Sequence, residues 1–92
     1  MDKAFIISPV CLQAQDVVYL EVFDHGKGEY CVIPCTVKWI EPDGLCLVDK
    51  SGFGHCCKID DFNEGHTRAT FGWRCWDTRP TTERMEALPW NR

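Results

Sequence analysis

The chain has 92 residues, of which 45% are hydrophobic and 26% are charged, and its formal net charge is −4. This length fits one domain over residues 1–92, and the apolar share excludes a wholly disordered chain. An acidic balance disfavours general nucleic-acid binding, which needs a basic surface. No apolar run approaches the about 20 residues of a membrane-spanning helix, so we expect no membrane partner.

Apolar and polar residues alternate along the first half of the chain, which is the pattern of β-strands. Residues 5–12 predict a strand that Pro9 interrupts. Residues 17–23 and 29–41 predict a long antiparallel hairpin, because the glycines between them permit a turn. Within the second of these strands, Pro34 marks a bulge or an outward-facing edge position. One face of the same strand is expected to carry Cys31, Ile33, Cys35, Val37 and Trp39.

Shorter strands are predicted in the second half of the chain. Residues 41–44 form a turn signal in which proline presets φ and glycine supplies the left-handed position. Strands are then expected over residues 45–48 and 55–59. Residues 67–76 are rich in threonine and aromatic side chains, and they predict one or two strands around Gly72.

A single helix is predicted at the C-terminal end. Within residues 80–88, Thr81 is the expected N-cap, and Pro89 is the expected stop. So short a helix must pack on the sheet, because it is not stable alone in water. Together the elements predict a mainly β fold: a small antiparallel barrel or rolled sheet of five to six strands with one short C-terminal helix.

The seven cysteines are expected to be reduced. The apolar stretch near the N-terminus is too short for a secretory signal, which predicts a cytoplasmic protein with reduced thiols. No Cys-x-x-Cys spacing is present, so we expect no metal and no other cofactor, and we interpret the thiols as small buried apolar groups. The alternatives are a reactive thiol or a zinc site at His55, Cys57 and His66, with Cys56 pointing to the opposite face from Cys57.

Asp60, Asp61 and Glu64 form an acidic cluster beside His66. A calcium loop would need an oxygen ligand where Phe62 stands, so the pattern does not match. Adjacent acids in a polar loop are usually solvated or structural, which is the interpretation we favour. The alternative is that these three acids form an acidic contact with a partner, in the manner of a nucleic-acid mimic.

The segment that ends the predicted sheet concentrates tryptophan and arginine. Two indoles three positions apart point to opposite faces of a strand, so one could fill the core and the other could be exposed. One interpretation is structural, with an indole in the core and Arg74 paired with an acid. The other is a recognition surface, because these side chains concentrate binding energy and can stack a nucleobase or hold a phosphate. The candidate ligand- or partner-binding residues are Trp73, Arg74, Trp76, Arg79 and Trp39.

Several short matches are spread over residues 31–90. They comprise Ile-Pro-Cys-Thr-Val at residues 33–37, the turn at Gly44, Asp61-Phe62, Trp-Arg-Cys-Trp at residues 73–76, Pro80-Thr81, Met85 and Pro89-Trp90. In these features the chain resembles small uncharacterised proteins of Gram-positive bacterial phages and mobile elements. The resemblance implies a strand that leads into a short C-terminal helix, and a setting in which small proteins bind, inhibit or sequester host components.

These observations lead us to expect a non-enzymatic, homo-oligomeric binding protein in the cytoplasm of the bacterial host. It would capture a host component, either by sequestering a small nucleotide-like signal or by blocking a host defence protein. The alternatives are a small zinc- or thiol-dependent enzyme and a structural or virion-assembly barrel.

Overall fold

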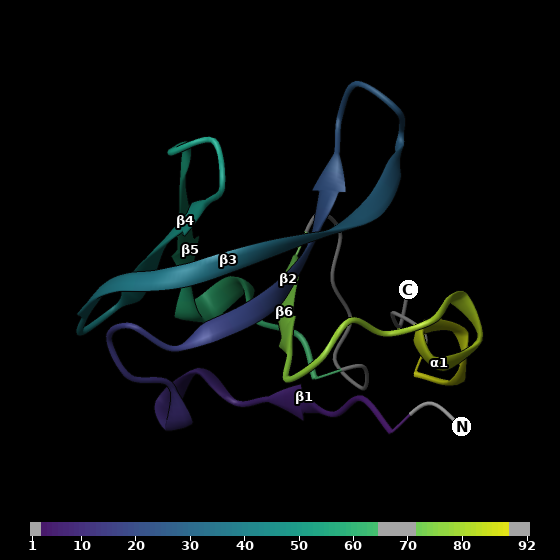
Figure 1. Ribbon diagram of the computed structural model, residues 1–92, viewed down its shortest axis with the longest axis horizontal. Coiled ribbons are helices and arrows are strands. Elements are labelled where there is room, and N and C mark those ends of the chain that lie inside the picture. The colour runs from purple at the N-terminus through teal and green to yellow at the C-terminus, as the bar shows by residue number, and fades with distance from the viewer. Residues whose placement is uncertain (1–2, 65–71, 89–92) are drawn as a thin grey trace.

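The computed structural model describes residues 3–64 and 72–88. Its strands, 3-10 turns (η) and helix follow one another as β1 (Ile6–Ile7), η1 (Pro9–Cys11), β2 (Val17–Asp24), β3 (Glu29–Glu41), β4 (Gly44–Asp49), β5 (Gly54–Lys58), η2 (Ile59–Asp61), β6 (Trp73–Trp76) and α1 (Thr82–Ala87). Figure 1 shows the long strand β3 crossing the molecule, with α1 beside the part of the sheet that holds β6 and β1. No helix in the described ranges is long and apolar enough to cross a membrane.

The strands form one six-stranded antiparallel sheet in the order β1-β6-β2-β3-β4-β5. This confirms the predicted mainly β fold with one short C-terminal helix. The closed barrel is wrong, because β1 pairs with β6 and β5 pairs with β4, so no ladder joins these two end strands in the described part of the chain. An isolated parallel bridge between Phe62 and Trp73 brings the segment after η2 against β6.

The predicted strand over residues 5–12 is largely replaced by a turn. Only Ile6 and Ile7 pair with β6, and Pro9 opens η1 at a position where its missing N–H is not needed. The helix is confirmed: the Thr81 side chain accepts a hydrogen bond from the Arg84 N–H, as an N-cap does. The strand expected over residues 67–76 is described only from residue 72 onward, and Pro89 lies outside the described residues.

The hairpin of β2 and β3 is confirmed, with Cα partners running from Val17 and Thr36 to Asp24 and Glu29. The Asp24 side chain accepts hydrogen bonds from the N–H groups of Gly26 and Lys27 in the turn. Gly28 closes the turn at φ +70°, a backbone conformation that residues with a side chain rarely adopt.

A bulge in β3 changes which face each residue occupies. Val37 lies opposite Leu47, but Trp39 lies opposite Cys46, so the register shifts between Val37 and Trp39. One extra residue reverses the alternation that follows it. Trp39 therefore lies on the opposite face from Val37, and the prediction that both share one face is wrong.

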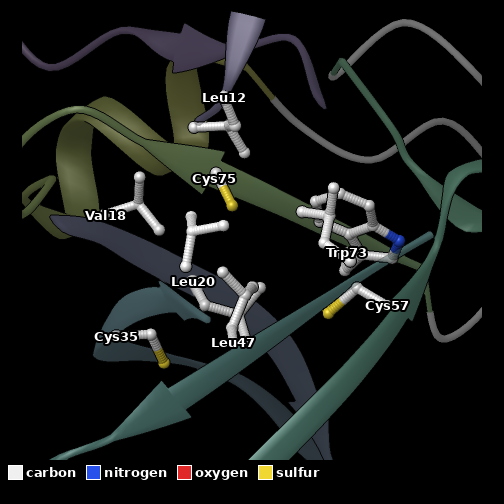
Figure 2. Packing of buried hydrophobic residues seen from close by; sticks show 10 residues of the cluster. Leu12, Val18, Leu20, Cys35, Leu47, Cys57, Trp73 and Cys75 are labelled. Carbon is white, nitrogen blue, oxygen red and sulfur yellow. The ribbon is translucent and has the colours of Figure 1, made fainter. Parts of the chain in front are cut away.

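The inner face of the sheet carries the hydrophobic core (Figure 2). Three cysteines belong to it, which confirms that they act as small apolar groups; burial raises the pKa of Cys35 to about 11 and that of Cys57 to about 12, and it also raises the pKa of Cys75. Cys11 and Cys56 are exposed instead. The buried cluster consists of Leu12, Val18, Leu20, Cys35, Val37, Leu45, Leu47, Cys57, Trp73 and Cys75.

Candidate functional site

Trp73 is a core residue. It lies opposite Val22 on the inner face of β6, and only 3% of it is exposed. Its Nε1 donates a hydrogen bond to the Lys58 carbonyl oxygen, and its ring meets Phe62 edge to face at 4.9 Å. The indole thereby connects β6 to the end of β5, and its role in this structure is packing.

Arg74 and Trp76 lie on the outer face of β6, where both meet Glu21 of β2. Trp76 Nε1 donates to Glu21 Oε1 at 2.8 Å, and Arg74 Nε donates to the same oxygen at 2.5 Å. All three residues are buried. This is the predicted pairing of Arg74 with an acid, and the acid is Glu21, to which no local sequence pattern points.

The helix explains why the outer face is buried here. Arg74 donates hydrogen bonds to the Leu88 and Met85 carbonyl oxygens at the C-terminal end of α1. From α1, the Arg84 guanidinium lies 6.0 Å from the centre of the Trp76 ring, and Arg84 Nε donates to the Ala4 carbonyl oxygen at 2.7 Å. The two indoles of β6 point to opposite faces, as predicted, but the expectation that one is exposed is wrong because α1 covers the second.

Arg79 is exposed, and its guanidinium lies 5.2 Å from the centre of the Tyr19 ring. It follows β6 on the way to α1. In Figure 1, the turn between β3 and β4, which is next to Trp39, lies on the opposite side of the view from α1. The structure therefore does not bring Arg79 and Trp39 into one site, and the five candidate residues do not form a common surface.

The acidic residues lie in η2 and in the segment that follows it. Asp60 and Asp61 lie exposed in η2, whereas Glu64 lines a hollow with Phe5 and Arg84. Between them, Asn63 is fully buried, and its N–H donates to the Trp73 carbonyl oxygen. All three acids are exposed and therefore stay available for contact.

The residues suggested for zinc are occupied in other ways. His55 Nε2 lies 3.0 Å from Asp49 Oδ2, and Cys57 lies in the core. The hydrogen bond from Ser51 has the largest effect on Asp49. Together with the hydrogen bond from His55, it holds the pKa of the Asp49 carboxyl group well below its usual value. Within the described ranges no group of three metal-ligating side chains gathers, and His66 lies outside them. The order Asp-Lys-Ser-Gly at residues 49–52 was a sequence signal for this turn.

Of the three candidate tryptophans, Trp39 is the one that the structure leaves open to a partner. It is 50% exposed, and its Nε1 donates a hydrogen bond to Glu41 Oε1 at 3.0 Å. Beside it lies a hollow of about 200 Å³ that is bordered by β3, β4 and β5. We define the Trp39 face by five residues that line this hollow: Trp39, Glu41, Cys46, Cys56 and Lys58.

The outer face of the sheet thus has two halves. The half on β6 and β2 is buried beneath α1, whereas the half on β3, β4 and β5 presents the indole of Trp39. The neighbouring Ile40 is 46% exposed but lies opposite Leu45, on the other face of β3 from Trp39. Comparison of the chain with protein-family models, with curated proteins and with solved structures found no match.

Proposed function

We propose that the chain is a non-enzymatic binding protein that captures a protein partner through the Trp39 face. The observation that carries this proposal is the half-exposed indole of Trp39, held by its hydrogen bond to Glu41. Tryptophan contributes more binding energy at protein interfaces than most other side chains. A fixed indole also loses little conformational freedom when it binds.

The surroundings of Trp39 favour a protein over a nucleotide-like ligand. The charged side chains of Glu41, Asp43 and Lys58 border the indole of Trp39, as a polar rim borders an interface. Two of these three charges are carboxylates, which repel a phosphate. The hollow of about 200 Å³ is also smaller than the roughly 300–1,000 Å³ of most small-ligand sites.

The partner class follows from the resemblance to small phage proteins. Such proteins act inside a bacterial host, so the partner we propose is a host protein, with a host defence protein as the leading case. The exposed acids Asp60 and Asp61 can extend the contact toward basic groups of that partner. The homo-oligomer expected from the sequence stays a prediction.

Co-purification from the bacterial host tests this proposal with matched variants. The tagged chain is compared with Trp39→Ala and with Phe53→Ala, since Phe53 is 64% exposed but lies in the turn at the other end of β4. We expect one protein to co-purify in stoichiometric amounts with the wild-type chain and with Phe53→Ala. The purified partner should bind Trp39→Ala about 30-fold more weakly, which is ~2 kcal/mol.

Three results would overturn the proposal. The first is equal affinity of the partner for the wild-type chain and Trp39→Ala, with both variants folded by circular dichroism. The second is a rise in melting temperature with a cyclic or ADP-ribose-type nucleotide, which would favour signal sequestration. The third is a wild-type homodimer that Trp39→Ala converts to a monomer, which would make a second copy the occupant of the Trp39 face.

A further inference from the structure

Two cysteines face each other across the hairpin of β4 and β5. Cys46 and Cys56 are Cα partners in the antiparallel register, and their side chains share a hydrogen bond. Directly opposed residues in such a pair have Cα atoms about 4.5–5.5 Å apart. A disulfide needs about 4.4–6.8 Å between Cα atoms, so the backbone already fits the bridge.

The two thiols differ in their access to solvent. Cys56 is exposed, whereas Cys46 is 5% exposed. Both line the hollow beside Trp39. A small reagent in solvent can therefore reach the exposed Cys56 sulfur first, while the buried Cys46 sulfur stays shielded from it. Burial is the main cause that raises the pKa of the Cys46 thiol, and the neighbouring Cys56 adds to it. Cys46 therefore forms the reactive thiolate less readily than a thiol in water.

We propose that Cys46 and Cys56 form a dithiol site whose co-reactant is a hydroperoxide, and that oxidation joins them by a disulfide across β4 and β5. This inference does not depend on the proposed function. Cys56 is the attacking thiol because it is the exposed member of the pair. Cys46 is the resolving thiol because it lies directly opposite.

The chemistry is balanced with hydrogen peroxide as the oxidant. The Cys56 sulfur, as thiolate, attacks one peroxide oxygen, the O–O bond breaks, and the released hydroxide takes up the thiol proton to give water. The Cys46 sulfur then attacks the sulfenic sulfur of Cys56, the S–O bond breaks, and the second hydroxide leaves with the Cys46 proton as water. The two thiols lose two electrons and two protons, and the peroxide is reduced to two waters.

The other cysteines provide internal comparisons. Cys57 is adjacent to Cys56 but lies opposite Leu45 and points into the core. Cys11 is exposed like Cys56, but it lies in η1, on the N-terminal side of β2. If exposure alone decided oxidation, Cys11 and Cys56 would behave alike. If the opposed pair decides oxidation, Cys56 forms an internal disulfide with Cys46, whereas Cys11 forms none.

Peptide mapping of the whole wild-type chain tests the proposal. The folded protein is treated at low concentration with one equivalent of hydrogen peroxide, its free thiols are alkylated in denaturant, and it is digested with trypsin. Cleavage after Lys38, Lys50 and Lys58 places Cys46 in peptide 39–50 and Cys56 in peptide 51–58. We expect these two peptides to be joined, to separate on reduction, and to fragment so that the link falls on Cys56 and not on Cys57.

Three variants sharpen the result. Cys56→Ser should abolish the link, whereas Cys46→Ser should leave a sulfenic acid at Cys56 that a dimedone probe labels. Cys11→Ser should leave the link unchanged. Fully alkylated Cys46 and Cys56 after peroxide treatment of the wild-type chain would overturn the proposal. So would a link from Cys56 to Cys11, or one between two chains on a non-reducing gel.

Discussion

Glu21 and Arg74 form an ion pair that is buried between the sheet and α1, with the Arg74 Nε 2.5 Å from Glu21 Oε1. Glu21 belongs to β2 and Arg74 belongs to β6, and they are Cα partners on the outer face of the sheet. The same carboxylate accepts the Trp76 N–H, and the same guanidinium donates to carbonyl oxygens at the end of α1. One pair of charges therefore links two strands, an indole and the helix.

Replacing Glu21 by Gln should destabilise the protein strongly. The variant leaves a buried guanidinium without its counter-charge, and breaking a buried pair in this way costs about 3–5 kcal/mol. The free energy of unfolding, measured by urea titration, should fall by that amount. Glu86→Gln on the exposed side of α1 is the control and should change the free energy by less than about 0.5 kcal/mol. Equal stability of the two variants would show that the buried pair contributes no net stabilisation.

Arg74→Lys should loosen α1. Lysine retains the positive charge next to Glu21, but it lacks the planar fork that also reaches the Leu88 carbonyl oxygen. Tryptic cleavage after Arg84, timed on the folded protein, should become about tenfold faster as the helix opens more often. Arg79→Lys is the matched exposed control and should cleave there at the wild-type rate. Unchanged cleavage in Arg74→Lys would mean that other contacts hold the helix.

Thr81→Ala removes the N-cap of α1. The Thr81 hydroxyl oxygen accepts the Arg84 N–H at 3.1 Å, and losing such a cap costs about 1 kcal/mol. Thr82→Ala, at the first helical residue, makes the same change in side-chain size. Thermal unfolding should therefore show a lower melting temperature for the Thr81 variant than for the Thr82 variant. The reverse order would show that Thr81 does not act as the N-cap of α1.

The stability of the turn between β4 and β5 should depend on pH through the Asp49 carboxyl group. Its carboxylate accepts hydrogen bonds from Ser51 and Phe53 and lies against His55, so its pKa in the folded state is lowered. A group with a lowered folded-state pKa stabilises the protein above its unfolded pKa of about 4, and this stabilisation is lost as the pH falls below that value.

Urea midpoints between about pH 5 and 3 test this dependence. The wild-type midpoint should fall with the pH, whereas Asp49→Asn should start lower and fall less steeply, because its side chain does not titrate. Lys50→Ala, at the neighbouring exposed residue, should retain the wild-type slope. A parallel decline of Asp49→Asn and the wild-type chain would assign the acid dependence to other groups.

The sequence was most informative where structure depends on near neighbours. Alternation along residues 17–23 and 29–41 correctly placed the central hairpin, because a strand with one buried face repeats every two residues. Thr81 correctly predicted the start of α1, because an N-cap acts within its own turn. The opposite orientation of Trp73 and Trp76 followed from the same two-residue period.

The candidate site was harder to predict, because burial depends on residues that are distant in the chain. The sequence showed that Trp76 and Trp73 point to different faces, but only the packed helix decided that both are enclosed. Alternation placed Trp39 on the same face as Val37, but the bulge between these two residues puts Trp39 on the opposite face. A bulge is set by pairing with β4, which local alternation does not record.

Residue types and local periods thus determined the strands, the hairpin, the helix and the use of cysteine in the core. Tertiary structure alone decided that Glu21 is the partner of Arg74, that Cys56 faces Cys46, and that Trp39 is the exposed indole among residues 3–64 and 72–88. The physical reason is that hydrogen bonds within a turn or along a strand are local, whereas burial and charge pairing depend on which segments meet across the sheet.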